Sequence, residues 1–510
     1  MFFEFSLFGA LVYTASVRGI HADLYGKRII IVFRKLVAIV PALFFSAVIG
    51  LPLPAQAQSS DQKKYEPTIA SLDTHPLPEW YADAKLGIFI HWGLYSVPGW
   101  AALHPSHEFT AGDYMLNNPY SEWYYNTVRV PNSPTAQYDR EHYGANHNYY
   151  DFTADFNKET KKWDPDSMAA IFRDAGAKYV VLTTKHHEGF TLWPSKVANP
   201  SQSNLTAERD IVGELSESVR KSGLKMGLYY SGGFDWTFNR GPIGTVAQDF
   251  EAAKPQSSAY GTYADAQAEE LIRLYHPAVL WNDIDWPKSG NALKVIADYY
   301  NAVPDGVVDD RYGISHSDFT SPEYAKLDQI SPKKWEECRG LGASFGYNRA
   351  EGEKETIAPQ ELIELLVDIV SKNGNLLLDV GPEADGTVPP VQLDRLQKLG
   401  AWLKQNGEAI YGTKPWTRAN GTTNQVDGSG RAVDLRFTQK DGHLYATLFG
   451  KPVSSTILLH NITVAPSSEI ALLGGAGPLK WTQKAGDLEV TLPKDLPGNY
   501  DWVLRLQSTK

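Results

Sequence analysis

The chain has 510 residues, enough to bury a large core and to form two or three domains. Its net charge of -11 and its lack of a long basic run argue against nucleic acid and anionic membranes as partners, and its single cysteine, Cys338, excludes a disulfide framework or a multi-thiolate metal site. Aromatic residues make up 12% of the chain, and flat rings with polar tips are suited to stacking on the faces of sugars.

The amino terminus has the pattern of an export signal. Basic residues between positions 27 and 35 precede the apolar run 36–50, and a small-x-small cleavage site ends at Ala57. A membrane anchor is the alternative, but the run is shorter than the roughly 20 residues of a spanning helix, and it contains Pro41. We therefore expect residues 1–57 to be a signal peptide with an over-extended start. The protein is then exported, either periplasmic or secreted.

The next part of the chain alternates apolar runs with amphipathic segments, which is the pattern of a βα barrel over residues 58–416. The expected strands are 86–91, 179–184, 225–230, 278–282, 307–310 and 375–380. The expected helices include 165–175, 211–221, 263–274 and 359–371. A parallel barrel gathers its strand ends at one face, where such enzymes place their sites. The polar segment 101–118 is expected to form a loop over this mouth.

After Trp416 the pattern changes to short alternating runs, separated by Asp-Gly, Gly-Gly and Pro-Gly turns. The expected strands are 432–438, 443–449, 455–459, 488–492 and 502–506. A domain of this size with such strands is typical of a small all-β fold. The predicted fold is thus a (β/α)8-like barrel followed by a C-terminal antiparallel β-sandwich over residues 417–510.

Asp283 is the strongest candidate for chemistry. The residues before it, Val-Leu-Trp-Asn, read as a short buried strand that Pro287 closes, so this carboxylate lies at a strand end beside Trp281 and Trp286. An Asp in this place is also a common helix N-cap. Retaining hydrolysis of a glycosidic bond needs one nucleophilic carboxylate and a second that donates a proton, about 5 to 5.5 Å away. Asp283 is our predicted nucleophile.

Three glutamates compete for the role of the second carboxylate. They are Glu323, Glu336 and Glu337. Pro322 stiffens the backbone just before Glu323 and favours it modestly, although any of the three is also compatible with a solvated surface acid.

The tandem pair His186-His187 follows another predicted strand. Neighbouring strand residues point to opposite faces, so adjacent histidines rarely bind one metal ion, and no His-x-His pattern occurs. Recognition of sugar hydroxyls is preferred over zinc binding, with a purely structural pair as the third alternative. His91, Tyr230 and Trp281 end other strands and are expected to join the same pocket. The glycine-rich run 340–346 lacks the features of a phosphate loop.

Several motifs, in this order along the chain, resemble the α-L-fucosidases of glycoside hydrolase family 29. The resemblance extends from about residue 66 to 416, and the trailing sandwich fits it. The motifs are Lys-Leu-Gly-Ile-Phe-Ile-His-Trp-Gly at 85–93, Glu-Trp-Tyr at 122–124, Lys-His-His-Glu-Gly-Phe at 185–190, Tyr-Tyr-Ser at 229–231, Trp-Asn-Asp at 281–283 and Asn-Gly-Asn-Leu-Leu-Leu-Asp-Val-Gly-Pro at 373–382.

The resemblance implies an exo-acting retaining α-L-fucosidase that hydrolyses terminal α-L-fucose from glycans by double displacement, with no cofactor and no metal. It implies that Asp283 is the nucleophile and that Glu323, in a Pro-Glu-Tyr run, is the acid/base, with Glu336 as the alternative. Asp283 is expected to stay ionised beside His or Arg donors, and Glu323 to hold its proton in less polar surroundings. The implied sugar contacts are His91, Glu122, Trp123, His186, His187, Tyr230, Trp281 and Arg311.

The implied partners are fucosylated oligosaccharides or glycoconjugates, without nucleic acid and without stable membrane insertion. Two other functions remain open: a catalytically inactive carbohydrate-binding protein, and a glycosidase for another L-sugar. The sequence leaves the linkage preference and homo-oligomerisation undecided. It also leaves open whether the sandwich binds glycan.

Overall fold

The computed structural model describes residues 64–103, 115–239, 241–244 and 247–507. The predicted signal segment 1–57 lies outside these residues, as does most of the loop predicted over residues 101–118. None of the helices in the described ranges combines the length and apolarity needed to span a bilayer.

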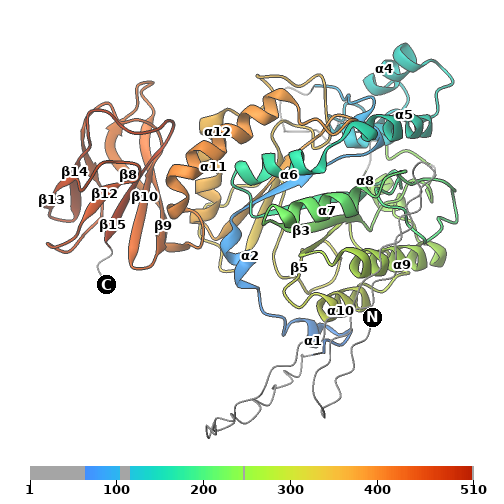
Figure 1. The fold of residues 1–510 in the computed structure, drawn as a ribbon, viewed down its shortest axis with the longest axis horizontal. Helices are drawn as coiled ribbons and strands as arrows, with labels where there is room; N and C mark the ends of the chain where they lie inside the picture. Colours follow the sequence, from blue (N-terminus) through green and yellow to red (C-terminus); the bar gives the residue numbers. More distant parts are fainter. Residues whose placement is uncertain (1–63, 104–114, 240, 245–246, 508–510) are drawn as a thin grey trace, which may run out of the picture. The chain divides into compact units, whose positions relative to one another are not determined.

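The first layer of the fold is a parallel sheet that curls into a barrel (Figure 1). Its strand order is β5-β4-β3-β2-β1-β7-β6. The strands are β1 (Leu86–Ile90), β2 (Tyr179–Lys185), β3 (Lys225–Ser231), β4 (Val279–Asp283), β5 (Val307–Val308), β6 (Trp335–Gly340) and β7 (Gly374–Val380). The sequence analysis predicted six of these strands and missed β6.

The gap between β5 and β6 is filled by residues 318–324, which act as an irregular eighth strand. The Asp318 amide donates to the Val308 carbonyl of β5 at 3.0 Å. On the other side, the Glu336 amide of β6 donates to Thr320, and the Cys338 amide donates to Pro322. Backbone pairing with β5 therefore holds the start of this segment, and pairing with β6 holds the end where Glu323 lies.

Helices follow the strands and cover the outside of the sheet. Asp164, Asp210 and Ser257 cap α6, α7 and α9 by accepting hydrogen bonds from first-turn amides. The main helices are α2 (Glu79–Ala84), α4 (Pro134–Tyr143), α5 (Phe152–Glu159), α6 (Pro165–Asp174), α7 (Ile211–Lys221), α8 (Ala247–Ala252), α9 (Ser258–Tyr275), α10 (Ala292–Ala302), α11 (Pro359–Ser371) and α12 (Pro390–Asn406), with one-turn helices α1 (Ile69–Leu72) and α3 (Tyr124–Thr127).

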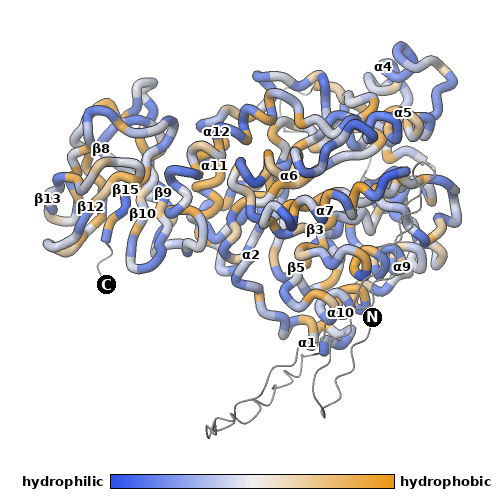
Figure 2. The backbone as a smooth tube through the Cα atoms, viewed as in Figure 1, coloured by the Kyte–Doolittle hydropathy of each residue, from blue (hydrophilic) through white to orange (hydrophobic). Residues whose placement is uncertain are grey.

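Successive side chains of a strand point to opposite faces of the sheet, so the apolar residues of the barrel strands belong to two clusters. In β1, Ile88 and Ile90 belong to the cluster shared with the helices. Phe89, between them, belongs to the barrel interior together with Tyr229 and Trp281. Figure 2 shows apolar segments in the interior of the barrel part, with hydrophilic residues at outer turns. The interior cluster fills the barrel below the polar residues at the strand ends.

The C-terminal part is an antiparallel sandwich, as predicted. Its strand order is β12-β15-β10-β9-β8-β11-β14-β13, and the long strand β8 joins two halves over one apolar core. The strands are β8 (Lys414–Val426), β9 (Ala432–Lys440), β10 (His443–Leu448), β11 (Thr456–Leu459), β12 (Ile470–Leu472), β13 (Lys480–Lys484), β14 (Asp487–Thr491) and β15 (Trp502–Gln507). Arg431 of the sandwich pairs with Glu364 of α11 at 2.6 Å. The predicted boundary after residue 416 stays a prediction.

Candidate active site

A cavity of about 210 Å³ opens at the carboxyl ends of the barrel strands. This is the face at which βα barrels place their sites. Aromatic rings and polar groups line it together, and the predicted residues Glu323 and Asp283 both reach it. The lining residues are Phe89, His91, Tyr120, Glu122, Trp123, His186, His187, Tyr229, Phe250, Trp281, Asp283, Ile284, Glu323, Cys338 and Phe345.

Asp283 is the last residue of β4 and is 8% exposed. Its Oδ2 accepts a hydrogen bond from the Tyr229 hydroxyl at 2.9 Å, and its Oδ1 accepts one from Arg311 Nη1 at 3.0 Å. Burial raises the pKa of Asp283 above its ordinary value, and the Arg311 cation and the Tyr229 hydrogen bond oppose this rise. An arginine donor, Arg311, is present beside Asp283 as predicted, although burial has the larger effect on the pKa of Asp283.

The backbone directly after Asp283 is strained. Ile284 and Asp285 both adopt the left-handed region, with φ of 61° and 70°, which is unfavourable for a β-branched residue. The turn packs against Gly233, where a Cβ atom would lie 1.6 Å from the Ile284 carbonyl oxygen. Lys254 holds the Asp285 carboxylate at 2.8 Å. The close packing of Gly233 and the ion pair with Lys254 thus stabilise the turn that follows Asp283, whose side chain points into the cavity.

Arg311 joins the two predicted catalytic carboxylates. The same nitrogen, Nη1, lies 3.0 Å from Asp283 Oδ1 and 2.6 Å from Glu323 Oε1. These two oxygens therefore lie at most about 5.6 Å apart, the sum of the two distances, which fits the roughly 5 to 5.5 Å between the carboxyl groups of retaining glycosidases. Glu323 is less buried than predicted, since its side chain is 37% exposed and pairs with a cation.

Three predicted histidines line the cavity, and two of them have Nδ1 within hydrogen-bond distance of a partner. His91 Nδ1 lies 2.6 Å from Asp379 Oδ1, and His187 Nδ1 lies 2.7 Å from Ser231 Oγ. Burial lowers the pKa of His91 and His187 well below the ordinary value. The cavity therefore presents neutral imidazoles, which suit an uncharged polar ligand. Among the described residues, no three His, Cys, Asp or Glu side chains form a metal-ligand group.

Glu122 and Trp123 lie side by side in a short 3-10 helix, Ser121–Trp123, and both line the cavity. Glu122 Oε2 accepts the Gly346 amide at 2.8 Å, and burial raises the pKa of Glu122 to about 8. The Trp123 ring meets His187 edge-on at 5.2 Å. The glycine-rich run 340–346 thus helps to orient Glu122.

Tyr230 is a correction to the predicted site. Successive residues of β3 point to opposite faces. Tyr230 turns outward into the helical layer, where its hydroxyl donates to Gln267 of α9, and its neighbour Tyr229 faces the cavity instead. Trp281 lines the cavity as predicted, with the Arg311 guanidinium 4.6 Å above its ring.

The alternative acids of β6 lie away from the cavity. Glu336 is fully buried beneath Trp281, whose Nε1 donates to it at 3.1 Å, and it also accepts from the Tyr81 and Tyr179 hydroxyls. Glu337 points to the opposite face of the strand and is also buried. Neither residue lines the cavity, so Glu323 has the better position.

Apart from Tyr229, sequence analysis did not identify several apolar lining residues. They are Phe89, Tyr120, Phe250, Ile284, Cys338 and Phe345. Phe89 precedes His91 by two positions in β1, so strand periodicity could have found it. Phe345 lies in a loop after β6, and no local pattern marks it.

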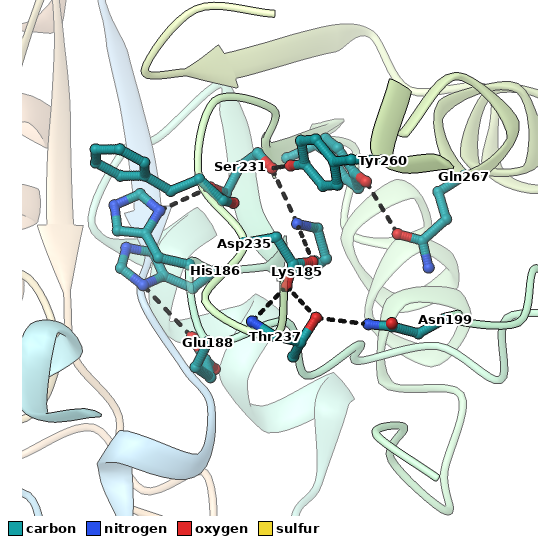
Figure 3. Close-up of polar contacts among 12 residues, drawn as sticks. Lys185, His186, Glu188, Asn199, Ser231, Asp235, Thr237, Tyr260 and Gln267 are labelled. Atoms are coloured by element: carbon teal, nitrogen blue, oxygen red, sulfur yellow. Dashed lines mark hydrogen bonds and ion pairs between the residues drawn. The ribbon is translucent and has the colours of Figure 1, made fainter. Parts of the chain in front are cut away.

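Lys185 and Asp235, near His186, form an ion pair (Figure 3). Both side chains are fully buried, and Lys185 Nζ also donates to the Ser231 carbonyl. Removal of one partner leaves an uncompensated buried charge. We expect Asp235→Ala to lower the free energy of unfolding by about 3 to 5 kcal/mol. Urea unfolding would measure this loss.

The matched control for Asp235→Ala is Asp305→Ala. Asp305 pairs with Lys225 at the surface, where both side chains are about half exposed. Exposed pairs contribute about 0 to 1 kcal/mol, so this variant should unfold almost as the wild type does. Equal effects of the two substitutions would contradict the importance of the buried pair.

Glu188 provides a pH-dependent prediction. Its Oε2 faces His186 Nδ1 at 3.5 Å, and neither atom has a hydrogen-bond partner within the described ranges. Burial raises the pKa of Glu188 from 4.5 to about 8. Between these values the folded protein keeps a proton that the unfolded chain has lost, so stability should fall as the pH rises. In Glu188→Gln, urea unfolding should show a smaller fall over this range. An unchanged slope would contradict the raised pKa.

Comparisons with known proteins give one family. Residues 53–408 match the family model for alpha-L-fucosidase, and residues 430–507 match its C-terminal domain. The chain is 34% identical to the tissue alpha-L-fucosidase of Rattus norvegicus, covering 91% of this chain and 97% of that protein. It is 36% identical to an alpha-L-fucosidase of Dictyostelium discoideum, covering 87% and 95%. The crystal structure of a Thermotoga maritima alpha-fucosidase with a mechanism-based inhibitor superposes with a TM-score of 0.80 at 41% identity, covering 87% of this chain and all of that one.

Proposed function

Because the chain belongs to the α-L-fucosidase family, glycoside hydrolase family 29, and is an α-L-fucosidase, we propose that Asp283 is its nucleophile and Glu323 its acid/base. One observation carries this assignment: the two carboxylates meet at the same nitrogen of Arg311 inside the barrel mouth. Their separation fits a mechanism with retention.

In the first step, an Asp283 oxygen attacks the anomeric carbon while Glu323 gives its proton to the departing glycosidic oxygen. A covalent fucosyl ester of Asp283 forms. In the second step, Glu323 takes a proton from water, and the water oxygen displaces Asp283 from the same carbon. Two inversions give fucose with retained configuration. Arg311 stabilises the Asp283 carboxylate before attack and when it leaves.

The proposed sugar contacts are His91, Glu122, Trp123, His186, His187, Tyr229, Trp281 and Arg311. The neutral imidazoles offer hydrogen bonds without a net charge, and the indoles offer flat apolar faces for a pyranose. This combination supports an uncharged sugar as ligand. Fucosylated oligosaccharides or glycoconjugates are the proposed substrates, with cleavage at the terminal fucose. The signal-like pattern at residues 1–57 supports export to the periplasm or the medium.

The test is the stereochemistry of the first product. Hydrolysis of 4-nitrophenyl α-L-fucoside would be followed by proton NMR before the released sugar equilibrates. The proposal requires α-fucose to appear first. If β-fucose appears first, the enzyme inverts, and Asp283 would instead activate a water molecule.

A further inference from the structure

Ser231, the last residue of β3, contacts two groups through one hydroxyl. Its Oγ lies 2.8 Å from the Phe234 carbonyl oxygen and 2.7 Å from His187 Nδ1. Ser231 is fully buried, and Figure 3 shows it beside Lys185 and Asp235. A hydroxyl has a single hydrogen, so it can donate to only one of these two partners.

The direction of both hydrogen bonds follows from this limit. A carbonyl oxygen can only accept, so the Ser231 hydrogen points to Phe234. The contact with His187 then needs a hydrogen on the ring nitrogen Nδ1. We propose that Ser231 is a positioning residue that holds His187 in the tautomer with hydrogen on Nδ1 and with a free lone pair on Nε2. This inference rests on the proposed role of His187 as a sugar contact.

The other nitrogen of His187 faces the nucleophile. His187 Nε2 lies 3.8 Å from Asp283 Oδ2, which is too long for a hydrogen bond. Burial keeps the imidazole neutral, so a hydrogen on Nδ1 leaves none on Nε2. Two acceptors, His187 Nε2 and Asp283 Oδ2, therefore lie next to each other. A sugar hydroxyl that donates to His187 Nε2 satisfies one of them, and Asp283 remains free to attack.

The loop that carries the Phe234 carbonyl is held firmly enough to maintain this arrangement. Lys185 Nζ donates to the Ser231 carbonyl at 3.0 Å and to Asp235 at 3.1 Å. The Trp236 amide donates to the His187 carbonyl at 2.7 Å. On the other side, the Gly233 amide donates to the Asp283 carbonyl at 3.0 Å. The loop thus contacts the backbones of both His187 and Asp283, so Ser231 is fixed relative to each of them.

Neutron diffraction of the deuterated protein tests the tautomer without relying on activity. We expect deuterium on Nδ1 of His187 and none on Nε2, with the Ser231 deuterium directed at the Phe234 carbonyl. Deuterium on Nε2, or a Ser231 deuterium directed at His187, would overturn the inference. Turnover of 4-nitrophenyl α-L-fucoside by the same preparation tests the proposed function separately.

Kinetics of Ser231→Ala test whether the tautomer matters for the reaction. Without its acceptor, Nδ1 loses its preference for hydrogen, and kcat/KM should fall about tenfold to a hundredfold. Ser216→Ala is the matched control, because Ser216 in α7 is equally buried and its hydroxyl has no partner in the described part of the chain. That control should retain wild-type kcat/KM. Wild-type activity in a folded Ser231→Ala, or an equal loss in Ser216→Ala, would contradict the role.

Discussion

Asp283→Ala is expected to lower kcat for 4-nitrophenyl α-L-fucoside by about three orders of magnitude or more, a barrier increase of at least about 4 kcal/mol. The substitution removes the oxygen that forms the covalent bond to the anomeric carbon. It also leaves Arg311 without one of its two carboxylate partners. Added azide should restore turnover, because this small anion can enter the space left by the carboxylate and attack the same carbon.

Asp305→Ala serves as the control for this loss as well. Asp305 lies outside the cavity, at the surface, so its removal should leave kcat unchanged. The rescued product carries additional information: attack by azide in place of Asp283 gives β-fucosyl azide. A folded Asp283→Ala protein with near-wild-type turnover would exclude Asp283 as the nucleophile.

Glu323→Ala has the second largest expected effect, and its size should depend on the leaving group. A general acid contributes about 10² to 10⁴ in rate when the leaving oxygen needs a proton, as with a natural fucosyl disaccharide. Nitrophenolate leaves with little help, so formation of the fucosyl-enzyme should be affected much less with the aryl fucoside. Stopped-flow measurement of nitrophenol release would show the preserved first step, followed by slow hydrolysis of the intermediate.

Glu337, another of the three glutamates considered from sequence, provides a comparison for Glu323. Glu337 is buried on the outer face of β6, and both of its oxygens lack hydrogen-bond partners within the described residues. Glu337→Gln should retain activity on both substrates. If azide accelerated Glu337→Gln but had no effect on Glu323→Ala, the acid/base role would belong to Glu337.

The barrel was predictable wherever strands and helices show clear periodicity, and β6 shows why one strand was missed. Its residues Trp-Glu-Glu-Cys-Arg-Gly include three charges, which argue against a buried strand. The structure buries Glu336 there because the Tyr81 and Tyr179 hydroxyls and the Trp281 indole donate to it. These donors come from distant parts of the chain, and no local pattern shows that they meet.

The site residues also differ in how far they could be predicted: some are marked by the local sequence, and others are placed by contacts between distant parts of the chain. Asp283 was the strongest local candidate because this carboxylate directly follows an apolar strand, although a helix N-cap was an alternative reading. The choice between Tyr229 and Tyr230 depends on which face of β3 is turned inward, and a shift of one residue reverses it. The position of Glu323 depends on backbone pairing of residues 318–324 with β6. Local sequence gave it only a modest preference, and the family resemblance was needed to select it.

The most direct test of the account is to identify the residue that bonds to the sugar. The protein would be incubated with 2-deoxy-2-fluoro-fucosyl fluoride, digested, and analysed by mass spectrometry. The fluorine slows hydrolysis of the fucosyl-enzyme, so the intermediate should accumulate. We predict that the fluorofucosyl group is attached to Asp283. Attachment to Glu323 or another residue, or inactivation without any labelled peptide, would contradict the proposed mechanism.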